Sequence, residues 1–364
     1  METEVLRIIE GGLTNDKRKI LTYSNKLADR LAKEGNEPLA KCIRQKINTI
    51  VPQSQAVADA VRLMPVDVDS HLQVVEIYPP DTIRQPVVLS PEVEKQISDF
   101  IEMVNHRSDL ELAGINVKKT MLLHGKPGCG KTSIAHYVSE KTGLPLIVAR
   151  LDGVVSSLLG STAKNLRRIF DYVQSMPCIL FLDEFDAIAK ARDDAHELGE
   201  LKRVINSLLQ NIDGMNADSV LIAATNHPEM LDSAVWRRFV QVVEVGLPSE
   251  QQISEMIDLF ASPFKSDVVS DSQKKKNIID SIKGLSPSDI KTIFDKVKVK
   301  SVIEGKMCLE TEELLASIYE VTCKNKSEVS YVMFLSSHGI PQTEISKRTG
   351  ISLRKVKSYL SEIK

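Results

Sequence analysis

The residues best suited to chemistry lie in the stretch GKPGCGKT at positions 125–132, which matches the pattern G-x-x-x-x-G-K-T in full. The stretch follows an apolar run (TMLLHG) and precedes a helical pattern (SIAHYVSEKTG). In this context, glycines let backbone N–H groups approach a phosphate, and the helix N-terminus adds a positive field. We expect Lys131 to reach the β- and γ-phosphates of ATP and the Thr132 hydroxyl to bind Mg²⁺. The expected ATP-binding residues are Gly125, Pro127, Gly128, Cys129, Gly130, Lys131, Thr132 and Ser133.

Two carboxylates and an amide follow the next apolar runs. The run ILFL ends in Asp183 and Glu184, and the run LIAAT ends in Asn226. Adjacent carboxylates at a strand end can be a solvated turn. Beside a phosphate-binding loop, however, Asp183 is expected to interact with Mg²⁺ and Glu184 to be the base that orients the attacking water. Asn226 is expected to contact the γ-phosphate or position that water, so the three residues predict hydrolysis of ATP.

A pair of arginines, Arg237 and Arg238, stands in the segment LDSAVWRRF with no evident partner inside its own subunit. One interpretation is a solvated surface charge cluster. The other is that both side chains are arginine fingers, which reach the phosphates bound by a neighbouring subunit. The second interpretation requires an oligomer.

The elements that must position these residues are predicted by hydrophobic patterning. Strand-like runs alternate with helical stretches between residues 118 and 245, which indicates an α/β fold with a parallel sheet and helices on both faces. A helix is expected from about Pro91 to Arg107, with Ser90 as its N-cap. Residues 249–323 have an all-helical pattern.

The two ends of the chain are expected to be helical appendages. Residues 3–50 have the spacing of about three short helices, and the proline-rich segment 51–90 indicates a linker with little regular structure. The sequence thus divides into an N-terminal helical domain (1–50), a linker (51–89), a large α/β subdomain (90–247), a helical subdomain (248–325) and a C-terminal unit (326–364).

The segments GKPGCGKT, ILFLDEFD and AATNHPEMLDSAVWRRF make residues 90–305 resemble the AAA ATPases of the AAA+ superfamily. The region is especially similar to the clade of katanin, spastin and the ESCRT-disassembly ATPase, and to related bacterial AAA proteins. This resemblance implies a P-loop NTPase sheet with a small helical lid, in a ring that is usually a hexamer, with both arginines acting in trans. It also implies Mg²⁺-dependent ATP hydrolysis that remodels, unfolds or disassembles a protein substrate, in some relatives beside a separate protease. Pro287 and Ser288 depart from the family's G-x-S/T-G-A-D lid turn, near the adenine.

The same resemblance suggests a pore loop. In the family, an aromatic–apolar–glycine loop lines the centre of the ring and grips an extended polypeptide. The matching residues here are Leu158, Leu159 and Gly160, with Leu158 in the place of the aromatic residue. Leucine can intercalate between substrate side chains but lacks a rigid stacking face. The alternative is that the two leucines cap the core and that the substrate is remodelled without threading.

The last part of the chain resembles a helix-turn-helix unit, in which Gly350 ends the first helix and Ser352 caps the second. Residues 341–364 contain six basic and two acidic residues, a net charge of +4. Such units bind DNA or dock on proteins, which leaves an alternative function: a nucleic-acid-associated ATPase switch, initiator-like or loader-like, recruited to DNA through this unit. The expected DNA contacts are Arg354, Lys355, Lys357 and Ser358.

Composition narrows the class of protein further. The net charge of −2 excludes a uniformly basic nucleic-acid coat protein. The five cysteines are scattered without a C-x-x-C pair, which indicates reduced thiols rather than a disulfide framework or a zinc site. The beginning METEVLRIIEGG lacks the features of a signal peptide, and no apolar run approaches the roughly 18 residues of a membrane span. We therefore expect a cytoplasmic protein.

Overall fold

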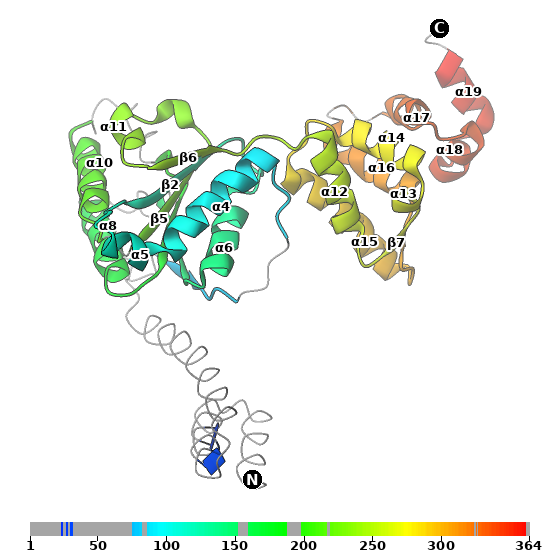
Figure 1. Cartoon of the computed structure of the whole chain (residues 1–364). Coiled ribbons are helices and arrows are strands. Elements are labelled where there is room, and N and C mark those ends of the chain that lie inside the picture. The colour runs from blue at the N-terminus through cyan, green and yellow to red at the C-terminus, as the bar shows by residue number, and fades with distance from the viewer. Residues whose placement is uncertain are drawn as a thin grey trace.

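The structure is a computed structural model that describes most of the chain from residue 75 onward. The described ranges are 75–81, 86–151, 159–187, 198–216, 219–323, 325 and 327–361, together with Tyr23, Ser24, Leu27, Arg30 and Leu31. The predicted N-terminal domain (1–50) lies outside them apart from those five residues. Figure 1 shows an α/β part followed by a helical part that ends in the C-terminal unit.

Six strands form the main sheet, in the order β1-β3-β4-β5-β2-β6. Every neighbouring pair in it is parallel except β1 and β3, which are antiparallel. The predicted α/β fold with a parallel sheet is therefore confirmed. Strand β5 lies between β4 and β2, so the carboxyl ends of these strands meet at one edge of the sheet. The strands are β1 (Glu76–Tyr78), β2 (Lys119–His124), β3 (Leu146–Arg150), β4 (Ile179–Asp183), β5 (Val220–Thr225) and β6 (Gln241–Glu244).

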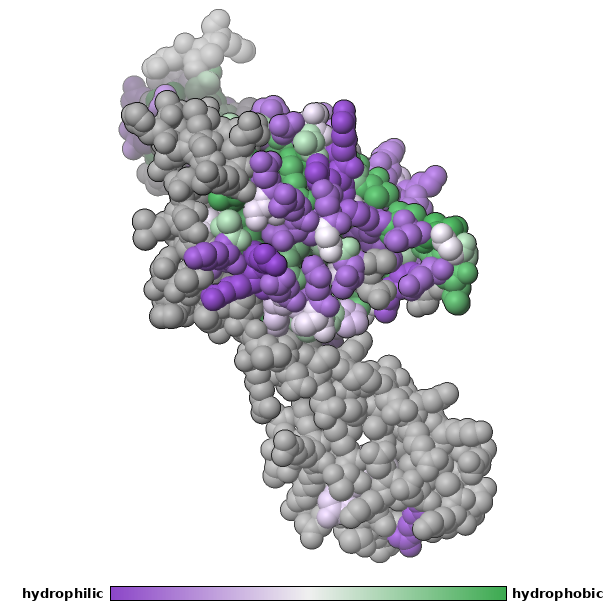
Figure 2. All heavy atoms as spheres, turned by 90° about the vertical axis from the view of Figure 1, so that its left-hand side faces the viewer, coloured by the Kyte–Doolittle hydropathy of each residue, from purple (hydrophilic) through white to green (hydrophobic). Residues whose placement is uncertain are grey.

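Helices cover both faces of the sheet, and this explains why the central strands are continuous apolar runs (Figure 1). Helices α4 (Pro91–Asn105) and α6 (Lys131–Thr142) pack on one face around Met121, Leu123 and Phe181. Helices α8 (Leu159–Val173), α10 (Leu198–Asp213) and α11 (Ser233–Trp236) pack on the other. Where its residues are described, the outer surface on the side of α8 and α10 is mostly hydrophilic (Figure 2).

The start of α4 follows the prediction closely. Ser90 is its N-cap and accepts a hydrogen bond from the Val93 N–H at 3.3 Å, and Pro91 is the first helical residue. Proline is favoured there because its missing N–H would have no partner in the first turn. The helix ends at Asn105, and a short helix, α5 (Arg107–Leu112), follows.

The predicted linker is wrong in one part. Glu76–Tyr78 form β1, which adds an antiparallel edge strand to the sheet through its pairing with β3. Val75 is buried in the core beside it. A strand of three residues is too short to produce a recognisable alternation.

The second half of the described chain is helical, as its pattern predicts. The elements are the 3₁₀ turn η2 (Pro228–Met230), which precedes α11, and then α12 (Glu250–Ala261), β7 (Lys265–Ser266), α13 (Asp267–Ser270), α14 (Ser272–Ile282), α15 (Pro287–Ile303), β8 (Cys308–Leu309), α16 (Thr311–Thr322), α17 (Glu328–Ser337), α18 (Gln342–Thr349) and α19 (Leu353–Ser361). Strands β7 and β8 form a small parallel pair. No helix in the described ranges is long and apolar enough to cross a membrane.

One apolar core runs through α12–α16 and on into α17–α19. It joins Ile278 and Ile318 of the lid-like helices to Val332, Ile345 and Val356 of the C-terminal unit, and each of these side chains is fully buried. The C-terminal unit is therefore packed onto the helical subdomain rather than tethered to it.

Candidate active site

The phosphate-binding loop connects β2 to α6, and two of its glycines are required for steric reasons. Gly125 has φ 144°, and a Cβ there would lie 2.1 Å from the Val245 carbonyl oxygen. Gly128 has φ 77°, and a Cβ there would lie 2.6 Å from the Ser286 hydroxyl oxygen. Glycine suits both positions, because each combines a positive φ with a neighbour that a Cβ would clash with. The loop is thus held between the edge strand β6 and the start of α15.

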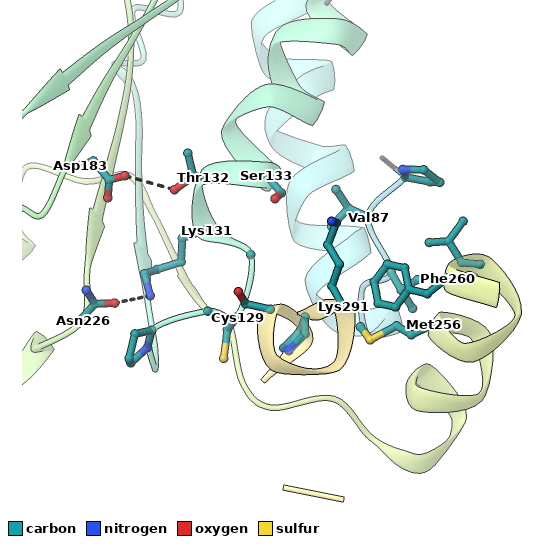
Figure 3. Close-up of a pocket in the computed structure, with 18 of the residues that line it drawn as sticks. Val87, Cys129, Lys131, Thr132, Ser133, Asp183, Asn226, Met256, Phe260 and Lys291 are labelled. Atoms are coloured by element: carbon teal, nitrogen blue, oxygen red, sulfur yellow. Dashed lines mark hydrogen bonds between the residues drawn. The ribbon is translucent and has the colours of Figure 1, made fainter. Parts of the chain in front are cut away.

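Lys131 lies at the first turn of α6 with its ammonium group in the loop. Its Nζ donates to the carbonyl oxygens of Gly125 (2.7 Å) and Lys126 (3.0 Å). It also donates to Oδ1 of Asn226 at 2.7 Å (Figure 3). Burial lowers the pKa of Lys131, and the neighbouring acidic groups partly offset this shift. Because the Asn226 oxygen accepts from Lys131, the amide NH₂ of Asn226 is the end suited to a phosphate or a water.

Thr132 and Asp183, the two expected Mg²⁺ ligands, lie next to each other in the structure. The Thr132 hydroxyl donates to Oδ2 of Asp183 at 3.1 Å (Figure 3). A hydroxyl and a carboxylate are hard oxygen donors of the kind that Mg²⁺ prefers when it also binds phosphates. The two residues therefore fit the expected metal, with room for the remaining ligands in the cavity that both of them line.

Glu184 has a left-handed backbone conformation, unlike the other non-glycine residues that the structure describes. Its φ is 54°, the single positive value at a non-glycine residue in the described ranges. A left-handed conformation at such a residue costs on the order of 1–3 kcal/mol and is found mainly at functional sites. Phe185 turns into the core, and its N–H donates to the Ala224 carbonyl oxygen at 2.8 Å. The exposed Glu184 instead lines the cavity.

Asp186 is a site residue that the sequence interpretation missed. It is buried, and its Oδ1 accepts hydrogen bonds from the Thr225 hydroxyl (3.0 Å) and the Asn226 N–H (3.2 Å). These bonds fix the end of β5 and therefore the position of the Asn226 side chain. The sequence DEFD at positions 183–186 contains this third carboxylate, but only Asp183 and Glu184 had been assigned a role.

The cavity beside the loop has a volume of about 410 Å³ and continues from the phosphate side to an apolar side. A flat nucleobase suits such an apolar, partly aromatic wall. The Ser288 N–H donates to the Gly128 carbonyl oxygen at 3.1 Å, so the unusual lid turn directly contacts the loop. The wall is formed by Val87, Val88, Met256, Leu259 and Phe260, with Pro287, Ser288 and Lys291 from α15 (Figure 3).

The two predicted arginine fingers differ in their surroundings. Arg238 is paired within its own chain: its Nε and Nη2 donate to Oδ2 of Asp213 at 3.1 and 2.8 Å, and Nη1 donates to the Ala234 carbonyl oxygen. The expectation that Arg238 has no partner in its subunit is therefore wrong. Arg237 is exposed, and no ion pair joins it to another described residue. Neither arginine lines the cavity.

The predicted pore-loop and DNA-contact residues belong to other segments of the chain. Leu158 is outside the described residues. Leu159 and Gly160 begin α8, but the Leu159 side chain is outside the described part of the structure. Arg354, Lys355, Lys357 and Ser358 are exposed on α19, in the C-terminal unit.

Cys129 offers a chemical test of the loop. It is buried with the apolar side chains beneath the loop and lines the cavity, so an alkyl group on its sulfur has to displace the phosphate-binding backbone. We expect N-ethylmaleimide modification of Cys129 to abolish nucleotide binding. The reaction is expected to be slow, because burial raises the pKa of the Cys129 thiol and the thiolate is the reactive form. The measurement is titration with a fluorescent nucleotide.

The partly exposed Cys308 and Cys323 provide the reference rate of modification in the same peptide map. Cys129→Ser is the matched control, which should bind nucleotide before and after treatment. Full nucleotide affinity of a chain modified at Cys129 would contradict this account of the loop.

Comparisons with known proteins agree with this geometry. The family model described as "ATPase family associated with various cellular activities (AAA)" matches residues 121–247. An AAA family ATPase of Sinorhizobium fredii is 36% identical over 236 residues, which are 65% of this chain and 72% of that protein. A protein of Methanocaldococcus jannaschii, provisionally named a 26S proteasome regulatory subunit homolog, is 32% identical over 212 residues, 56% of this chain and 55% of that protein. The phosphate loop, the acidic strand end and the asparagine surround one cavity. Together with these similarities, they show that the chain belongs to the AAA family of ATPases.

Proposed function

We propose that this AAA ATPase works as a hexameric ring, in which Arg237 of one subunit completes the ATP site of the neighbouring subunit. The observation that carries this proposal is the incomplete charge of the pocket. Among its described lining residues the cations are Lys131 and Lys291, while Arg237 is exposed outside it. An arginine supplied in trans stabilises the charge that develops on the transferred phosphoryl group.

Within one subunit, each residue is assigned a role in hydrolysis. Lys131 would exchange its protein acceptors for the β- and γ-phosphate oxygens. Thr132 and Asp183 would hold Mg²⁺, which would supply charge neutralisation when bound. Glu184 accepts a proton from the attacking water, and the Asn226 NH₂ orients that water or the γ-phosphate. Arg238, held by Asp213, positions the segment that carries Arg237.

We further propose that hydrolysis remodels, unfolds or disassembles a protein substrate in the cytoplasm, and that a separate protease or effector can act beside the ring. The relative named a proteasome regulatory subunit homolog supports a protein substrate. The match of residues 158–160 to the family's loop supports a pore loop, and Leu159 and Gly160 are the first two residues of α8. The scattered cysteines, free in the described ranges, are typical of a reducing compartment.

The pore-loop assignment is tested by Leu158→Ala. The truncation removes the side chain that would intercalate between substrate residues, so we expect processing to stop while ATP hydrolysis without substrate continues. The substrate is first identified as the protein retained by a Glu184→Gln chain in ATP, and its unfolding or release is then followed by gel filtration. Leu158→Ile, which keeps an apolar side chain, is the matched control. Unchanged processing by Leu158→Ala would remove the pore loop from the proposal.

A further inference from the structure

The outermost helix of the C-terminal unit has one buried and one cationic face. Helix α19 lies at the end of the helical part farthest from the sheet (Figure 1). Gly350, with φ 71°, ends α18, and the turn leads to Ser352, whose hydroxyl accepts from the Lys355 N–H at 3.4 Å. Val356 is fully buried against the core that also holds Ile345. The turn and the shared core thus pack α19 against α18.

The exposed face of α19 carries Arg354, Lys357 and Ser358, which are spaced i, i+3 and i+4 and therefore lie together on the helix surface. No described acidic side chain forms an ion pair with Arg354 or Lys357. Lys347 is a further exposed cation on α18. Arg348, in contrast, is directed toward Glu313 of α16 at 3.6 Å, so its charge serves the contact with the helical subdomain.

We propose that this face binds duplex DNA, with α19 lying in the major groove and Arg354 and Lys357 contacting phosphates or base edges. The major groove admits an α-helix, and cationic side chains beside it supply the electrostatic part of the affinity. Protein docking surfaces instead centre on aromatic or apolar anchors. None of the exposed large apolar side chains in the described ranges lies within residues 327–361, so the chemistry of this face favours a polyanion.

Lys355, unlike Arg354 and Lys357, forms an ion pair with another described residue of the chain. Its Nζ pairs with Oε2 of Glu328 at 2.8 Å, and the Tyr359 hydroxyl donates to the same oxygen at 3.2 Å. This internal counter-charge ties α17 to α19 and competes with any phosphate for Lys355. The prediction of Lys355 as a DNA contact is therefore modified: the residue becomes available only when a phosphate displaces Glu328. Removing that carboxylate should strengthen the binding of DNA.

The experiment uses the full-length chain, because the C-terminal unit shares its core with the helical subdomain. The probe is a fluorescein-labelled duplex of about 30 base pairs, roughly three helical turns. Its anisotropy is titrated with protein between about 50 and 200 mM KCl. The variants are Arg354→Ala combined with Lys357→Ala, Glu328→Gln, and Lys276→Ala. Lys276 is an exposed lysine of α14 outside the C-terminal unit, so its substitution removes a charge without touching α19.

The unaltered chain is expected to bind with an affinity that falls as salt rises. The double variant should lose about tenfold or more in affinity, and its salt slope should decrease by up to about two, one for each lost phosphate contact. Glu328→Gln should bind several-fold more tightly, and Lys276→Ala should match the unaltered chain. Thermal unfolding of each variant verifies that it is folded.

Undetectable or salt-independent binding by the unaltered chain would overturn the proposal and favour a protein-docking role for the unit. An equal loss in Lys276→Ala and in the double variant would also overturn it, because charge alone would then explain the binding. The readout is binding rather than hydrolysis. A chain that binds the duplex but forms no ring therefore supports this inference while contradicting the proposed function.

Discussion

Glu184→Gln is expected to lower the rate of ATP hydrolysis by about 10²–10⁴-fold while leaving nucleotide binding intact. The amide keeps the size of the side chain but cannot accept a proton from the attacking water, and general-base catalysis typically contributes a factor of this size. The residues proposed to hold the phosphates, Lys131 and Thr132, are unchanged and remain bonded as described. The expected product is a chain that binds ATP and remains in the ATP-bound state.

The measurement pairs phosphate release with titration of a fluorescent nucleotide, and light scattering reports whether ATP locks the oligomer. Glu229→Gln is a suitable control, because Glu229 lies beyond the end of β5, pairs with His227 at 3.0 Å and does not line the cavity. It should hydrolyse ATP at the normal rate. Hydrolysis by Glu184→Gln within a few-fold of normal would show that another group is the base.

Much of the ATP site could be predicted because each of its parts is a short, continuous segment of the sequence. The loop is one continuous motif, and Asp183 and Asn226 each end an apolar strand. Parallel strands bring their carboxyl ends to one edge of a sheet, so residues that follow separate strands can belong to one site. The 3.1 Å contact of Thr132 with Asp183 and the 2.7 Å contact of Lys131 with Asn226 agree with that reasoning.

The apolar side of the cavity could not be predicted in the same way. Val87 and Val88 come from a proline-rich segment that had the composition of a linker, whereas Met256 and Phe260 come from α12. An apolar side chain that lines a cavity has the same sequence pattern as one that fills a core. Only the packing of the helical subdomain against the loop brings these residues together.

Arg238 shows a second limit of sequence reasoning. Its partner Asp213 is the last residue of α10, and the pair forms because α10 and α11 pack on the same face of the sheet. Long-range ion pairs leave no periodic signal in a sequence. Two adjacent arginines therefore looked equivalent, although one of them contributes to the fold and the other is exposed.

We therefore expect Arg237→Ala to affect ATP hydrolysis and Arg238→Ala to affect the stability of the fold. Arg237→Ala should lower hydrolysis by about 10³–10⁵-fold, the effect typical of a lost arginine finger, without changing the melting temperature. Arg238→Ala should reduce the free energy of unfolding by about 1 kcal/mol or less, because its pair with Asp213 is partly exposed. Phosphate release and thermal unfolding are measured on both variants. A stable but equally inactive Arg238→Ala would contradict a purely stabilising role for Arg238.

Mixing subunits tests whether Arg237 acts in trans. A subunit with Arg237→Ala retains its own Glu184, and a subunit with Glu184→Gln retains its Arg237, so a boundary that joins the two intact halves should hydrolyse ATP. In an equal, random mixture about one boundary in four has this arrangement, which sets the expected recovery at about a quarter of normal activity. Trp236, the single tryptophan of the chain, lies beside Arg237 and reports co-assembly by its fluorescence. If the mixed subunits assemble and remain inactive, Arg237 cannot complete a neighbour's site, because each missing function is present in the other half.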